Sequence, residues 1–262
     1  VQNNILSVGV SLESQIKSIE EFIKKNNRKK TIIMYPKNEY TKLIDSKINN
    51  MNLEKKKIFK YDPDPKVLTG DIEKLTNYKQ RKRNLISRVK MLEEKEDEAS
   101  KIELKRLEQK YTIGKVNFDS VIIADFDENL KSVATSLLYT DVSSKRISYI
   151  TLNQWFDESL LKDVSLHPIY FPSINKANYK LFMNDFKNAY GLDGDQLSFL
   201  SYDLIGLVYF LIYENDFKIS KKIFYKNNKF KGKIGVFEIS KNTITHQLNF
   251  YSIEDKKFKK IF

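Results

Sequence analysis

Three segments of the chain share one pattern: a short apolar run rich in β-branched residues, then a polar loop, then residues with the spacing of a helix. They are Lys30–Tyr40, Asp119–Asp127 and, more weakly, Arg146–Trp155. Strands that are apolar throughout, rather than alternating, are buried on both faces and are typical of parallel sheets covered by helices. The repeated units therefore predict an α/β fold with an open, mainly parallel sheet flanked by helices.

Ligands of open α/β sheets bind beyond the carboxyl ends of the strands. The residues that follow the three runs are therefore the candidate ligand-binding residues: Tyr40, Asp125, Phe126, Asn153 and Trp155. A tyrosine can pack against a ligand and donate a hydrogen bond, whereas Phe126 can only pack. Trp155 is the single tryptophan, and two interpretations stay open for it, stacking on a ligand or anchoring the packing.

Composition limits the function classes. The chain has 262 residues, of which 41% are hydrophobic, enough for a large core. It has no cysteine, which excludes disulfides, thiolate catalysis and cysteine-bound zinc. The apolar run Leu204–Tyr213 is far shorter than the ~20 residues that span a bilayer, so we expect no membrane span. The net charge of +12 fits either a polyanion partner or a genome whose codons favour lysine, asparagine and isoleucine.

Further segments predict the remaining elements. Ser11–Lys25 has the spacing of an amphipathic helix with an N-cap at Ser11, and the prolines of Asp62–Pro65 are expected to close a strand and exclude helix. Residues 71–112 predict one long charged helix or a helical hairpin. Positive charges alone occur from Lys79 to Lys90, whereas Glu93–Glu98 is nearly all negative, which marks either a partner surface or a solvated insertion.

The C-terminal third predicts two helices, at 176–190 and 196–213, followed by a β-hairpin. The hairpin is indicated by alternating apolar residues over Lys231–Ser240 and Thr245–Ile253, with a turn at Lys241–Thr243.

An enzyme is not expected. The histidines, His167 and His246, lie far apart without acidic residues at metal-motif spacing, and neither a nucleophile elbow nor a glycine-rich phosphate loop is present. We therefore predict no catalytic residue, no metal and no cofactor. The alternative is a nucleic-acid or polyanion-binding module built on residues 217–233, where lysines alternate with aromatic residues.

The order of these elements resembles the type I periplasmic solute-binding proteins, the family of branched-chain amino-acid receptors and penicillin-binding protein activators. The segments that carry the resemblance are Phe22–Tyr40, Asn117–Asp125, Ile150–Trp155, Tyr202–Val208 and Phe230–Ile239. The charged segment 71–112 is more similar to the activator branch. The family fold implies two lobes: residues 10–167 would form lobe two, including the insertion 71–112. Residues 168–227 would supply helices of an incomplete lobe one, and the hairpin 228–262 would rejoin lobe two.

The resemblance also implies a function. We expect a non-catalytic periplasmic protein of the ABC-transporter substrate-binding or activator type, which binds a small polar ligand or a cell-wall-synthesis partner between its lobes. The ligand would be an amino acid, an amide or a muropeptide, and a partner would be an ABC permease or a peptidoglycan synthase rather than nucleic acid. Amino-acid receptors place a carboxylate near the position of Asn153, so a neutral amide there argues against an α-amino acid. The signal peptide and the first half of lobe one are expected to precede Val1.

Overall fold

A central seven-stranded sheet organises the chain in the computed structural model, which describes residues 9–95, 97–218, 228–240 and 243–262. The strand order is β10-β9-β5-β4-β3-β1-β2, and β1 to β5 run parallel. The strands are β1 (Lys30–Pro36), β2 (Lys55–Tyr61), β3 (Ser120–Ile123), β4 (Ser148–Thr151), β5 (Ile169–Ser173), β9 (Asn249–Glu254) and β10 (Lys257–Lys260). The predicted open, mainly parallel sheet is confirmed.

Both faces of this sheet are covered by helices, as the continuous apolar runs predict. Alternate residues of β1 enter different cores: Met34 packs in one with β3 and with α6 (Asp127–Tyr139), and Ile33 packs in the other with α1 (Leu12–Lys25). The first core also includes α3 (Pro65–Leu75), and the second includes α2 (Thr41–Ile48). The N-cap expected for α1 is confirmed, because the Ser11 hydroxyl accepts a hydrogen bond from the backbone N of Ser14 at 3.1 Å.

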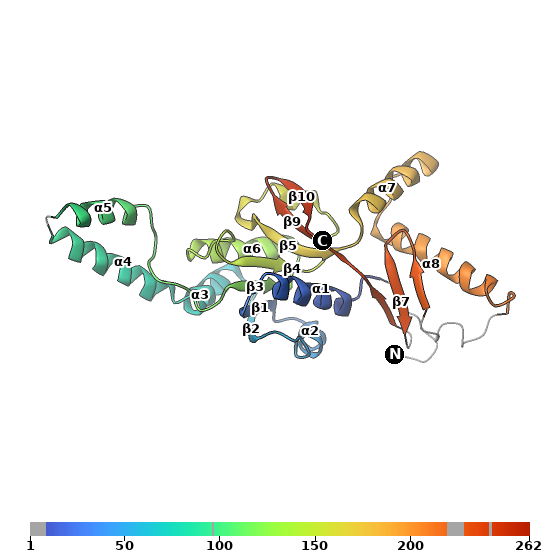
Figure 1. Cartoon of the computed structure of the whole chain (residues 1–262), viewed down its shortest axis with the longest axis horizontal. Coiled ribbons are helices and arrows are strands. Elements are labelled where there is room, and N and C mark those ends of the chain that lie inside the picture. The colour runs from blue at the N-terminus through green and yellow to red at the C-terminus, as the bar shows by residue number, and fades with distance from the viewer. Residues whose placement is uncertain (1–8, 96, 219–227, 241–242) are drawn as a thin grey trace.

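A helical hairpin is inserted between β2 and β3, as the charged segment predicts. It consists of α4 (Tyr78–Glu93) and α5 (Glu98–Leu107), and it projects away from the sheet (Figure 1). Its start is later than predicted, because residues 71–75 belong to α3, whose Ile72 is buried in the core. The prolines do not exclude helix here. Pro65 opens α3, where its missing N–H is not needed, and Asp64 caps the helix.

The C-terminal third departs from a simple hairpin. β6 (Asn228–Lys231), β7 (Val236–Ser240) and β8 (Thr243–His246) form a separate antiparallel sheet, which lies beside α8 (Gln196–Tyr213) (Figure 1). The predicted pairing of the two alternating segments is confirmed for β7 with β8, whereas β9 leaves this sheet and pairs with β5. The predicted turn lies largely at residues 241–242, outside the described part of the chain.

The boundary expected at residue 167 does not coincide with the end of the main sheet. β5 pairs in parallel with β4 and ends only at Ser173. The third repeated unit also differs, because β4 is followed by two short 3-10 turns, Glu158–Leu161 and Val164–Leu166, instead of an α-helix.

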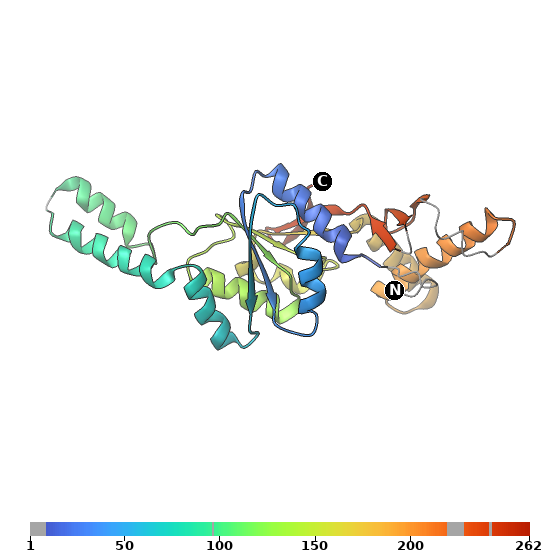
Figure 2. The same cartoon turned by 90° about the horizontal axis from the view of Figure 1, so that it is seen from below.

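The helices α7 (Lys176–Tyr190) and α8 lie at the end of the molecule opposite the hairpin (Figures 1 and 2). The small sheet is fastened to α8 by Asp203, whose carboxylate accepts hydrogen bonds from the backbone N of Lys233 at 2.8 Å and of Ile234 at 2.7 Å. A side chain on Gly232 would collide with this carboxylate, because a Cβ there would lie 2.2 Å from Asp203 Oδ2.

The exposed face of α8 is apolar. Its large exposed side chains are Leu197, Tyr202, Ile205, Tyr209, Phe210 and Tyr213. In the described part of the chain, α8 is the one helix that is long and apolar enough to cross a membrane, a test that core helices of soluble proteins also pass.

Candidate functional site

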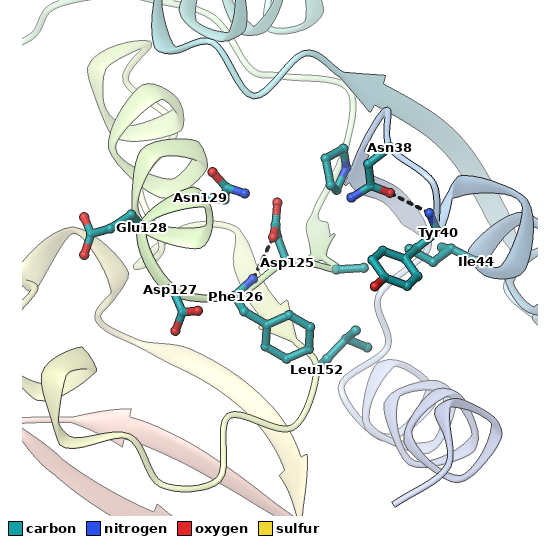
Figure 3. Close-up of a pocket in the computed structure, with 11 residues that line it drawn as sticks. Asn38, Tyr40, Ile44, Asp125, Phe126, Asp127, Glu128, Asn129 and Leu152 are labelled. Carbon is teal, nitrogen blue, oxygen red and sulfur yellow. Dashed lines mark hydrogen bonds between the residues drawn. The ribbon is translucent and has the colours of Figure 1, made fainter.

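The loops that follow β1 and β3 enclose a pocket of about 560 Å³ at the carboxyl edge of the sheet (Figure 3). Three of the five predicted site residues, Tyr40, Asp125 and Phe126, line it together. The other lining residues are Pro36, Asn38, Ile44, Ala124, Asp127, Glu128, Asn129 and Leu152. The parallel sheet thus brings together residues separated by more than eighty positions in the sequence.

Two hydrogen bonds hold the Asp125 carboxylate in the pocket. Its side chain is 8% exposed, and one carboxylate oxygen accepts a hydrogen bond from the Tyr61 hydroxyl at 2.5 Å. The other oxygen accepts from the backbone N of Phe126 at 2.8 Å. Burial, followed by the hydrogen bond to Asp125, raises the pKa of Tyr61 far above its ordinary value, so this tyrosine stays a neutral donor. The two donors fix the orientation of the Asp125 carboxylate at the pocket edge.

Tyr40 and Phe126 supply the exposed aromatic surfaces of the pocket. Tyr40 is 58% exposed and Phe126 is 45% exposed, so both rings remain free to cover a ligand. Tyr40 is held by an Asx turn, in which Asn38 Oδ1 accepts a hydrogen bond from the Tyr40 backbone N at 3.0 Å. Large aromatic rings that stay exposed while hydrogen bonds fix their backbone are typical of binding surfaces rather than of packing.

The N-terminus of α6 forms the remaining polar wall. Asp127 and Glu128 are the first residues of this helix, where acidic side chains are favoured by the helix dipole. Both point away from Tyr40, and Glu128 forms an ion pair with Lys131 at 2.7 Å (Figure 3). The lining contains three carboxylates and no lysine, arginine or histidine. The sequence analysis did not identify Asn38 and Asn129 as pocket residues. Asn38 lies two residues before Tyr40, and Asn129 lies three residues after Phe126.

Asn153 does not line this pocket. It is 3% exposed, and its Oδ1 accepts hydrogen bonds from the backbone N of Trp155 at 3.0 Å and from the Ser173 hydroxyl at 2.8 Å. Its own backbone N donates to Gln15 Oε1 at 2.8 Å. Gln15 donates in turn to the Val10 carbonyl. Asn153 therefore links three segments that are distant in the sequence, and its Nδ2 is buried without a partner among the described residues.

The same region holds the start of α1 to the second sheet. The Ser14 hydroxyl accepts a hydrogen bond from the backbone N of His246 at 2.8 Å. Residues 10–15, Asn153, Ser173 and His246 thus meet where the chain leaves or re-enters the main sheet. We name this group the crossing cluster.

Trp155 packs in the protein and does not line the pocket. It is half-buried against the core, with its ring centroid 6.1 Å from that of Tyr179. Of the two interpretations left open by the sequence, the structure favours packing.

The nucleic-acid alternative depended on residues 217–233, and residues 219–227 lie outside the described part of the chain. Of its described aromatic residues, Phe230 packs beside Phe237 and Phe210, whereas Phe217 is 65% exposed. Across the described ranges, no group of three or more histidine or acidic side chains is placed to hold a metal ion.

Comparison with known proteins places the fold. No family model and no curated protein sequence matches the chain. A solute-binding protein of an ABC transporter from Rhodopseudomonas palustris BisB5, in complex with 3,4-dihydroxybenzoic acid, matches with a TM-score of 0.53 and 13% identity. The match covers 95% of this chain and 62% of that protein.

Two further structures are similar to the chain. An ABC-transporter substrate-binding protein from Desulfitobacterium hafniense, in complex with Leu, has a TM-score of 0.56 and 10% identity, with 95% and 65% of the two chains covered. The C-domain of LpoA from Haemophilus influenzae, a regulator of PBP1A, has a TM-score of 0.57 and 11% identity, with 100% and 72% covered. The chain therefore has the fold of type I periplasmic binding proteins, and it spans less than two thirds of the length of the first two of these structures.

Proposed function

We propose that this protein is a non-catalytic periplasmic binding protein that holds a small ligand in the pocket formed after β1 and β3. One observation carries the proposal: Tyr40, Asp125 and Phe126 converge on a single pocket at the carboxyl edge of a parallel sheet. That edge is where open α/β folds bind ligands. The similar solute-binding structures, one in complex with a benzoic acid and one with Leu, support the same role.

The lining indicates the chemistry of the ligand. Asp125 presents an oriented carboxylate, and the pocket offers no cationic side chain. A carboxylate ligand without a positive partner would be repelled, whereas an ammonium or amide N–H would pair with Asp125. Apolar contact is available from Tyr40, Phe126 and Leu152. We therefore propose an amphipathic amine or amide as the ligand.

α-Amino acids carry the ammonium group of this class, together with a carboxylate for which the lining offers no cationic side chain. The sequence argument against them assumed that Asn153 would stand next to the ligand ammonium. The pocket is not lined by Asn153, and Asp125 provides a carboxylate instead. That objection therefore does not apply to this pocket.

A thermal-shift screen of amino acids, amides, muropeptides and hydroxybenzoates tests the proposal. A ligand present at 100 times its Kd stabilises the native state by about 2.7 kcal/mol, which for a chain of this size raises Tm by roughly 5–10 °C. We expect amines or amides to produce this shift and hydroxybenzoates to produce none.

Variants then connect a shift to the pocket. Y40A and D125N should abolish the ligand-induced shift, whereas Y111A, which removes a tyrosine that is 75% exposed and lies outside the pocket, should preserve it. A shift that survives in both Y40A and D125N would place the ligand elsewhere. If the hydroxybenzoates shift Tm and the amines do not, the assignment of Asp125 is wrong.

A regulatory role is the second candidate, favoured by the match to the LpoA C-domain over the whole chain. In that case no metabolite shifts Tm, and the protein binds a purified peptidoglycan synthase in a direct assay. Failure of both the screen and this assay would exclude both functions.

A further inference from the structure

The α4–α5 hairpin is separated from the pocket and from both sheets. It is inserted between β2 and β3 and projects from the molecule without packing against the second sheet (Figures 1 and 2). With 16 residues, α4 is about 24 Å long. Such a projecting element exposes most of its surface, so its side chains are available to other molecules.

A buried arginine fixes the base of the hairpin. Arg81 is 5% exposed and donates hydrogen bonds to the carbonyl oxygen of Thr140 at 3.0 Å and to Thr112 Oγ1 at 2.7 Å. Its Nε donates to the Gly114 carbonyl oxygen at 3.3 Å. The hairpin is therefore held in place where it leaves the core, and its surface is presented in a defined direction.

The inner face of α4 uses its polar groups within the hairpin. Arg88 and Glu103 of α5 form two parallel hydrogen bonds of 3.0 and 2.7 Å, and Leu92 is buried. These contacts account for the residues of α4 that face α5.

The outer face of α4 is basic and largely unpaired. Lys79, Arg83, Ile86 and Lys90 follow one another at spacings of four, three and four, which places them in one stripe along the helix. Residues 79–90 contain six basic residues and no acidic one. Lys79 has only a long ion pair of 3.9 Å with Glu73. Among the described residues, Lys82, Arg83 and Lys90 form no ion pair.

A groove on α5 adds an apolar element. It has a volume of about 480 Å³ and is lined by Ala99, Ile102, Glu103, Arg106, Leu107 and Lys110. Ile102 is 54% exposed, and Glu103 is already paired with Arg88. The groove thus offers an apolar floor, and the two cations at its edge, Arg106 and Lys110, form no ion pair with any residue that the structure describes.

We propose that the α4–α5 hairpin is a docking site for an acidic, amphipathic segment of a partner protein. Carboxylates of the partner would pair with the basic stripe of α4 and with Arg106 and Lys110, and an apolar side chain would enter the groove beside Ile102. Charge complementarity of this kind guides association and selects the partner. The proposal holds whether or not the pocket binds a ligand.

The composition of the hairpin favours a protein over other polyanions. Single-stranded nucleic acid is bound by basic grooves that also carry exposed aromatic rings, and the only aromatic residue of α4, Tyr78, is buried. Helices that bind anionic lipid need a broad apolar face. The outer stripe of α4 offers only Ile86, so this face lacks the broad apolar surface that lipid binding requires.

The test uses the whole chain and a labelled 15-residue helical peptide rich in glutamate with two leucines on one face. Fluorescence anisotropy at low salt should show binding that weakens as salt is added. K82E/R83E/K90E should reduce affinity about tenfold, because it replaces three attractive charges with three repulsive ones. I102S should reduce it severalfold.

Matched controls separate specific docking from net charge. K55E/K57E/K257E reverses three exposed lysines of the main sheet and changes the net charge equally, and V164S removes an exposed apolar side chain elsewhere. Both should bind the peptide within about twofold of the wild type. Circular dichroism confirms that each variant is folded.

Three results would overturn the proposal. One is equal loss of binding in the control and in the α4 variant. Another is a failure of the wild-type protein to bind the peptide. The last is tighter binding to a 15-nucleotide single strand, or to phosphatidylglycerol vesicles, that also depends on Lys82, Arg83 and Lys90.

Discussion

The buried His246 predicts an acid sensitivity that can be calculated. Its side chain is 7% exposed at the end of β8, its ring lies tilted against that of Phe237 with centroids 5.6 Å apart, and its Nδ1 has no partner among the described residues. Burial lowers the pKa of His246 from 6.5 to about 4, because a charged imidazolium would lose its hydration there.

The direction and the size of the change in stability with pH follow from the linkage between proton binding and unfolding. Between pH 6.5 and pH 4 the unfolded chain binds a proton at this position and the native protein does not, so the free energy of unfolding falls as the pH falls. Stability is complete above about pH 6.5. Between pH 7 and pH 5, this single group removes about 2 kcal/mol, because roughly 1.5 pH units of that range lie below the unfolded pKa of 6.5 and each unit corresponds to about 1.36 kcal/mol.

Urea unfolding at pH 7 and pH 5 measures this loss. H246Q should lose most of the pH dependence, whatever its stability at pH 7. H167Q is the matched control, because His167 is the other histidine and its Nε2 lies 2.9 Å from the Leu160 carbonyl oxygen. We expect H167Q to retain the loss of about 2 kcal/mol. If H246Q remains as acid-sensitive as the wild type, burial of a neutral His246 is not the cause.

Three further predictions concern packing and the crossing cluster. G232A should destabilise the protein by about 2 kcal/mol or more, because its Cβ would lie 2.2 Å from Asp203 Oδ2. G70A is the control: Gly70 lies in α3, a Cβ there would meet no atom within 4 Å, and the change should stabilise the protein slightly. Differential scanning fluorimetry compares the two variants. R81M should cost about 3 kcal/mol by leaving buried acceptors unpaired, and hydrogen exchange should show loss of protection in α4; unchanged protection there would contradict the role of Arg81. N153A should lower Tm and leave the ligand-induced shift intact; loss of the shift at unchanged Tm would place Asn153 at the ligand.

The parallel sheet could be predicted because its signal is local. β1 and β3 are apolar throughout, and residues after each strand must meet at one edge, which is why Tyr40, Asp125 and Phe126 were found from the sequence. β5 was missed because Pro172 argues against a central strand. In the structure, the parallel pairing with β4 ends at Tyr170, so Pro172 needs no ladder hydrogen bond on that side.

The sequence alone could not predict the role of residues that depend on partners far away in the chain. Asn153 follows β4 as Asp125 follows β3, and position alone predicts the same role for both. The difference arises because Gln15 Oε1 accepts a hydrogen bond from the backbone N of Asn153, a contact that spans 138 residues, and Ser173 donates to Asn153 Oδ1. Likewise, the alternating pattern of residues 231–253 contains no sign that β9 leaves one sheet for another.

The course of α6 has a practical consequence. Its first residues form the wall of the pocket, and Thr140, directly after its last turn, accepts a hydrogen bond from the base of the hairpin. The two surfaces are thus held apart by a rod of 13 residues, about 20 Å long. Mutations in the pocket can therefore abolish ligand binding without disturbing the hairpin, and mutations in the hairpin can abolish docking without disturbing the pocket. Cells that carry one or the other class of variant would reveal which surface their physiology requires.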